Sequence, residues 1–125
     1  MNVLAWGLQI LVAVAFLASG ALKVVQPKEK LSAQMTWVEH FTAAQVKTIG
    51  AVEVIGALGL VLPAVTSIAV ILVPLAALGL ALVMAGAAVT HLRIKDPVAM
   101  AVPAIVLGLL SLVLAILRFG PAQLS

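Results

Sequence analysis

Three residues that can carry a charge interrupt or end the long apolar stretches of this chain: Lys23, Glu53 and His91. Glu53 is the eleventh residue of a 20-residue segment, residues 43–62, that is otherwise almost entirely apolar. A carboxyl group in such a place can hold a proton, accept hydrogen bonds or pair with a basic side chain. Together the three residues form the candidate site, and its chemistry would be proton binding, hydrogen bonding or ion pairing.

The position of Glu53 in its segment predicts which way its side chain points. A charged residue at the centre of a membrane helix costs about 2.5–3.5 kcal/mol on insertion scales. The segment contains nine Val, Ile and Leu residues, and each returns about 0.3–0.6 kcal/mol. Because the two terms nearly cancel, we expect Glu53 to face the inside of a helix bundle and to meet a partner or water.

Two basic residues are candidate partners for Glu53. Lys23 ends the first apolar segment and His91 ends the third, so both lie on the membrane side from which the Glu53 helix enters. We expect Lys23 or His91 to approach Glu53 directly or through one water. Three plainer interpretations remain open: Lys23 extends to the headgroups, His91 is an interfacial polar residue, and Glu53 is a hydrogen-bonded structural group.

The elements that must position these residues follow from composition. Hydrophobic residues make up 65% of the 125 residues and charged residues only 9%, whereas a soluble domain needs a polar outer surface. About 20 apolar residues are needed to cross a bilayer core of about 30 Å. The sequence therefore predicts one all-α domain, 1–125, a four-transmembrane-helix bundle. We expect helices at 3–25, 43–62, 68–91 and 97–118, with a short amphipathic helix on the membrane surface at 29–41.

Local signals set the expected helix ends. Thr42 and Gln45 fit a capping box at the start of the second helix, and Pro63 predicts its end. The third helix begins either at Ile68, with a kink at Pro74, or near Pro74 itself.

Further signals mark the two terminal helices. Asp96 and Pro97 form an N-cap and N1 pair for the fourth helix. The first apolar stretch, residues 3–22, is 20 residues long, against about 7–15 for the core of a secretory signal. We therefore expect a membrane helix there.

Basic residues predict the orientation of the bundle. Six of the seven fall on or beside the first and third loops, and one, Arg118, lies on the opposite side. The positive-inside rule then places those two loops in the cytoplasm and both termini outside. The six residues are Lys23, Lys28, Lys30, Lys47, Arg93 and Lys95.

Several kinds of chemistry lack the residues they would need. The chain has no cysteine, which excludes a thiolate nucleophile, an iron–sulfur cluster and a disulfide scaffold. The only two histidines are His40 and His91, so we expect neither a metal site nor bis-histidine haem ligation. Because the basic residues cluster in two loops without interleaved aromatic residues, we do not expect nucleic-acid binding.

Three short motifs carry a resemblance to a known family. They are Ser19-Gly20-Ala21-Leu22-Lys23, Gly50-Ala51-Val52-Glu53 continuing into Gly56-Ala57-Leu58-Gly59, and Gly86 to Arg93. In their order and spacing, and with four helices, they resemble the DoxX and DoxX-like membrane proteins over nearly the whole chain. The resemblance implies a small bacterial inner-membrane protein. The family is named after a subunit of a thiosulfate:quinone oxidoreductase, and some relatives are linked to oxidative-stress complexes or to assembly of other membrane proteins.

Three functions therefore fit the sequence. The favoured one is a non-catalytic membrane subunit or assembly factor that binds a membrane-protein partner or a second copy of itself. The first alternative is the membrane subunit of a quinone-linked oxidoreductase, in which Lys23, Glu53 and His91 would contact the quinone. The second is a small carrier or proton path that uses Glu53. The sequence does not decide whether the protein is an enzyme, although it shows no catalytic motif or cofactor signature.

Overall fold

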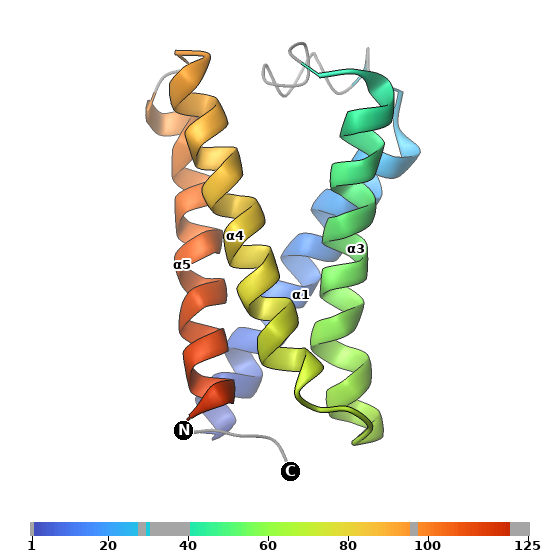
Figure 1. The fold of residues 1–125 in the computed structure, drawn as a ribbon, viewed down its shortest axis with the longest axis vertical. Coiled ribbons are helices and arrows are strands. Elements are labelled where there is room, and N and C mark those ends of the chain that lie inside the picture. The colour runs from blue at the N-terminus through green and yellow to red at the C-terminus, as the bar shows by residue number, and fades with distance from the viewer. Residues whose placement is uncertain (1, 28–29, 31–40, 96–97, 121–125) are drawn as a thin grey trace.

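Four long helices make up the protein. The computed structural model describes residues 2–27, 30, 41–95 and 98–120. The helices are α1 (Asn2–Val25), α3 (Ala43–Thr66), α4 (Leu72–Arg93) and α5 (Val98–Phe119), and no strand occurs in the described part of the chain (Figure 1). The predicted all-α four-helix bundle is confirmed. The amphipathic segment 29–41, apart from residues 30 and 41, and the Asp96-Pro97 cap lie outside the described residues and stay predictions.

The helices are arranged as two pairs. α1 packs mainly against α3, and α4 packs mainly against α5. α1 runs diagonally behind the bundle, from the C-terminal end of α5 to the N-terminal end of α3 (Figure 1). α3 and α4 separate towards the end of the bundle away from the chain termini (Figure 1). The apolar core lies mostly in the half nearer the termini, where Val12, Phe16, Leu60, Val73, Leu80 and Leu114 are buried.

The outer faces of the helices are apolar, which indicates that they are surrounded by lipid and not by water. Large side chains such as Leu11, Ile55, Leu82 and Ile116 are more than half exposed on the bundle surface. All four helices are long and apolar enough to cross a membrane. In water so large an apolar surface would drive aggregation, whereas in a bilayer it contacts lipid chains.

The start of α3 has the capping box that the sequence predicts. The Gln45 backbone N–H donates to Thr42 Oγ1 at 3.1 Å, and the Thr42 backbone N–H donates to Gln45 Oε1 at 2.9 Å. Two of the unpaired donors at this helix end are thereby satisfied.

The expected end of the second helix at residue 62 is wrong. α3 continues through Pro63 to Thr66, and Ser67 then turns the chain with a left-handed φ of 58°. A proline lacks one backbone donor, but the residues that follow it can still bond to carbonyls of the preceding turn. Because lipid offers no water to free backbone groups, continuing the helix is favoured over breaking it.

The expected start of the third helix at Ile68 is also wrong. α4 begins at Leu72, which places Pro74 in the first turn, and ends at Arg93 rather than at His91. A first-turn proline forfeits no bond, because backbone N–H groups there have no partner within the helix. The alternative prediction, a start near Pro74, is therefore closer to the observed start at Leu72. α5 continues through Pro103, and the observed bounds of α1 and α5 differ from those expected by one residue.

The arrangement predicts how introduced cysteines should react. Pro27 and Ser67 are exposed and follow the ends of α1 and α3, which run in opposite directions. Because the chain has no cysteine of its own, Pro27→Cys and Ser67→Cys each give a single reactive thiol. We expect an impermeant maleimide added to whole cells to label Ser67→Cys, and to label Pro27→Cys only after permeabilisation. Labelling of both from one side would contradict the bundle, and exchanged sides would contradict the orientation alone.

Candidate functional site

α1 and α3 approach each other closely at two glycines, Gly20 and Gly50. A Cβ atom built on Gly20 would lie 2.6 Å from the Gly50 carbonyl oxygen, and one built on Gly50 would lie 2.6 Å from Lys23 Cβ. Contacts this short exclude a side chain at either position unless the backbones move apart. The two glycines thus let the helices touch backbone to backbone, as small residues do in membrane helix packing. This crossing brings Lys23 on α1 beside Glu53 on α3.

Lys23 and Glu53 form a buried ion pair. Lys23 Nζ lies 2.6 Å from Glu53 Oε1 and also donates to Ser19 Oγ at 2.7 Å. Lys23 is 6% exposed and Glu53 is 1% exposed. Such a charge-assisted bond is stronger than a neutral one, and in apolar surroundings each charge offsets the cost of burying the other. The Lys23 side chain therefore turns into the bundle and does not extend to the headgroups.

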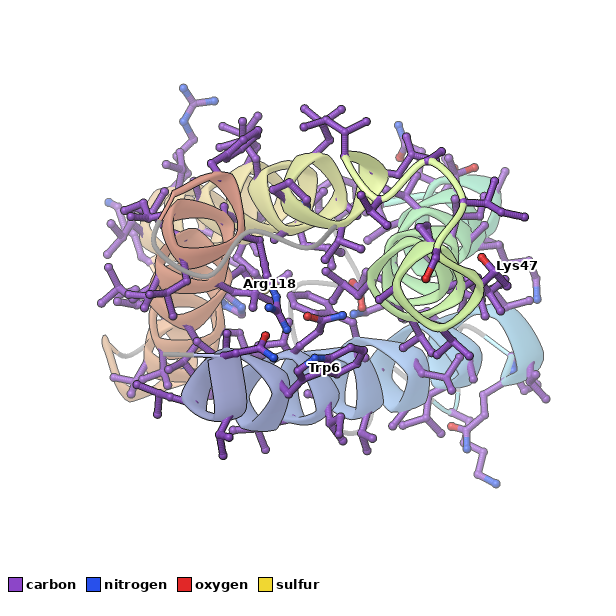
Figure 2. The ribbon with its side chains drawn as sticks, turned by 90° about the horizontal axis from the view of Figure 1, so that it is seen from below. Trp6, Lys47 and Arg118 are labelled. Atoms are coloured by element: carbon purple, nitrogen blue, oxygen red, sulfur yellow. The ribbon has the colours of Figure 1, made fainter. Side chains whose placement is uncertain are left out.

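Lys47 provides the contrast. Its side chain is exposed on the outside of the bundle (Figure 2) and donates to the Val24 carbonyl at 2.7 Å. Lys23 and Lys47 thus lie towards the same end of the α1–α3 pair, but only Lys23 meets a carboxylate.

The ion pair forms part of the wall of a cavity of about 480 Å³. All four helices contribute to it, in the half of the bundle where α3 and α4 separate. His91 is 9% exposed and lines the same cavity. The structure thus places all three candidate site residues around one cavity, and the ion pair in its wall joins Lys23 to Glu53. The residues that line the cavity are Ser19, Lys23, Phe41, Ile49, Glu53, Val83, Met84, Gly86, Ala87, Thr90, His91, Pro103, Ala104 and Leu107.

The second carboxylate oxygen of Glu53 has a different environment from the first. Oε2 is buried and accepts no hydrogen bond from any described residue. An ionised carboxylate can accept several hydrogen bonds, and most buried polar atoms find at least one partner. The site therefore combines a satisfied ion pair with one strong acceptor that the described protein groups leave unused.

A second buried polar cluster, which was not predicted from the sequence, lies at the opposite end of the bundle. Arg118 is 1% exposed; its Nε donates to Gln9 Oε1 at 2.8 Å, and its Nη1 donates to Asn2 Oδ1 at 2.8 Å. Gln9 Nε2 in turn donates to the Leu60 carbonyl at 2.5 Å. Arg118 Cζ lies over the Trp6 ring, 5.2 Å from its centroid, and both side chains point towards the middle of the bundle (Figure 2).

The spacing of the polar residues on the first helix is the signal that could have revealed this cluster. Asn2, Trp6 and Gln9 are separated by four and then three positions, which places them on one helix face. The cluster joins α1 to α5 and, through the Leu60 carbonyl, to α3. It therefore holds these three helices together at the end of the bundle opposite the cavity.

Gln9→Leu tests whether the Arg118 cluster stabilises the bundle. The change removes both the acceptor for Arg118 Nε and the donor to Leu60, so we expect the free energy of unfolding to fall by about 1–2 kcal/mol. Gln26→Leu, at a partly exposed position just after α1, is the matched control and should change it by less than about 0.5 kcal/mol. Unfolding in detergent, followed by circular dichroism, measures both. Equal effects of the two changes on the free energy of unfolding would show that the Arg118 cluster does not stabilise the bundle.

The chain is therefore a small four-helix integral membrane protein with a buried ion pair in the wall of a cavity. A family model described as the DoxX-like family matches residues 7–114, and the chain therefore belongs to the DoxX-like family. No curated protein and no solved structure matches it.

Proposed function

We propose that this DoxX-like protein is a non-catalytic membrane subunit that holds a small lipophilic molecule with a polar head in its cavity. The observation that carries the proposal is the Lys23–Glu53 ion pair in the wall of a cavity of about 480 Å³. Small-molecule sites in proteins are typically about 300–1,000 Å³, mostly apolar, with a few polar groups that orient the ligand. This cavity has that size and that kind of lining.

The position of the cavity suits a ligand that arrives from the bilayer. It lies where α3 and α4 separate (Figure 1). Gly86 of α4 lines it and is exposed, and no atom lies within 4 Å of where its Cβ would be. A lipophilic molecule in the membrane could thus enter from the side, past the small residues of α4.

The ion pair supports binding better than catalysis. Lys23 and Glu53 are each held by the other in the ion pair, an arrangement that can orient a bound molecule. The chain has no cysteine to act as a nucleophile. A partner protein would therefore carry out any reaction of the bound molecule, and the exposed apolar helix faces offer surfaces for such a partner.

A quinone-linked subunit is the second candidate. Lys23, Glu53 and His91 line one cavity, and a quinol, the reduced form of a quinone, is a lipophilic molecule with a polar head. The carrier or proton path is less well supported. The buried core around Phe16, Leu60 and Leu80 and the Arg118 cluster lie between the cavity and the terminal end of the bundle. We propose the bacterial inner membrane as the location, with the cavity in the cytoplasmic half.

Native mass spectrometry of gently extracted protein tests the proposal with one matched pair of variants. Gly86 lines the cavity, whereas Gly79 on the same helix does not, and a Cβ at either position meets no atom within 4 Å. We expect the wild type and Gly79→Leu to carry a bound lipophilic molecule and Gly86→Leu to lose it. A wild type without any such molecule, or equal retention by both variants, would contradict the proposed function.

A further inference from the structure

Lys23 and Glu53 both line the cavity, but their polar atoms differ in how many hydrogen-bond partners they have. Lys23 Nζ already donates to Glu53 Oε1 and to Ser19 Oγ. Glu53 Oε2 is buried in a residue that is 1% exposed, and no described residue donates to it. An ionised acceptor without a donor in apolar surroundings is costly. A ligand that brings a donor to this oxygen removes that cost, so the geometry discriminates between kinds of polar head.

Resting on the proposed function, we infer that the cavity selects lipophilic molecules whose neutral head donates a hydrogen bond, such as an aromatic hydroxyl, to Glu53 Oε2. A carbonyl, ether or carboxylate head has only acceptor atoms to offer and would place them against another acceptor. Lys23 cannot readily turn to such a head, because doing so would break the bonds it makes to Glu53 and Ser19.

An ammonium head is disfavoured for a separate reason. Lys23 and Glu53 together carry no net charge, so a cationic ligand would introduce an uncompensated positive charge close to Lys23. Taking that charge out of water in an apolar cavity is costly, and the Lys23 ammonium would repel it. A hydroxyl supplies the same hydrogen-bond donor without the charge.

The remaining lining of the cavity favours an apolar body for the ligand. Val83, Met84 and Leu107 from α4 and α5 provide apolar surface across the cavity. A ring or short alkyl chain buried there gains hydrophobic and dispersion energy without needing further polar partners. The ligand class is therefore an alkyl-substituted phenol or a molecule of the same pattern.

A matched pair of ligands isolates the inferred hydrogen bond. 4-Octylphenol donates a hydrogen bond through its hydroxyl, and 4-octylanisole is the same molecule with that hydrogen replaced by a methyl group. Calorimetric titration of protein in lipid nanodiscs, with empty nanodiscs subtracted, measures both affinities. We expect the phenol to bind about tenfold more tightly than the anisole in the wild type, and neither to bind to Gly86→Leu.

Glu53→Gln should remove the preference. The amide oxygen can still accept from Lys23, but a donor group replaces Oε2, so the affinities should come within about twofold or reverse in order. A second measurement needs no variant: binding of the phenol should shift the infrared carboxylate band of the wild type, and the anisole should leave it unchanged. If the phenol shifts no carboxylate band, or if the preference survives Glu53→Gln, the inference is overturned.

The outcomes separate the inference from the proposed function. If both ligands bind the wild type equally and Gly86→Leu abolishes both, the inference fails while ligand binding in the cavity stands. If neither ligand binds the wild type and no lipophilic molecule co-purifies with it, the proposed function fails as well.

Discussion

Replacing Lys23 with alanine is expected to lower the free energy of unfolding by about 3–5 kcal/mol, because it leaves the Glu53 carboxylate buried without its cation. Lys23 Nζ and Glu53 Oε1 are 2.6 Å apart, and Glu53 is 1% exposed. The double change Lys23→Ala with Glu53→Gln should recover part of this loss, since a neutral amide costs less to bury than a carboxylate. Reversible unfolding in mixed detergent micelles, followed by circular dichroism, gives the values for each member of the cycle.

Lys47→Ala is the matched control for this cycle. Lys47 also contacts α1 from α3, through the Val24 carbonyl, but its side chain is exposed. Its removal should change the free energy of unfolding by less than about 1 kcal/mol. If Lys23→Ala were no worse than Lys47→Ala, or if the double variant were no more stable than Lys23→Ala alone, Lys23 and Glu53 would not be energetically coupled.

Gly20→Ala is expected to destabilise the protein by about 3 kcal/mol, near the upper end of the usual cost of overpacking. The added methyl group would lie 2.6 Å from the Gly50 carbonyl oxygen, which is backbone and cannot rotate away. α1 and α3 must therefore separate, and the Lys23–Glu53 distance should increase with them. The same unfolding measurement reports the loss.

Gly7→Ala provides the control on the same helix. No atom lies within 4 Å of the position of its Cβ, and alanine favours a helix over glycine by about 0.5–1 kcal/mol. This variant should be as stable as the wild type or slightly more stable. Equal destabilisation by the two changes would mean that the Gly20–Gly50 contact does not hold α1 against α3.

Much of the fold follows from the sequence because only a few kinds of backbone structure can span a bilayer. Backbone groups in lipid must bond within their own segment, so four long apolar stretches predict four helices. The meeting of Glu53 and Lys23 could be predicted for a related reason. A carboxyl group at mid-helix must turn inward, and Lys23 and His91 are the basic residues that end the first and third apolar segments on its side of the membrane.

The parts that sequence reasoning missed depend on details of packing. Arg118 looks like an ordinary basic residue at a helix end, and its burial becomes apparent only once α1 is known to lie across the end of α5. Pro63 looks like a helix end, yet the cost of exposing backbone to lipid carries α3 on to Thr66. The cavity itself depends on how far α3 and α4 separate, which no local pattern encodes.

The distance between Lys23 and Glu53 in a bilayer can be measured directly. Solid-state NMR on protein in liposomes, with ¹⁵N at lysine Nζ and ¹³C at glutamate Cδ, detects the dipolar coupling of a fixed ion pair. With Lys23 Nζ 2.6 Å from Glu53 Oε1, we expect a strong coupling in the wild type that is lost in Lys23→Met and retained in Lys47→Met. A wild type without that coupling, or a coupling that persists in Lys23→Met, would show that Lys23 and Glu53 do not form the buried ion pair.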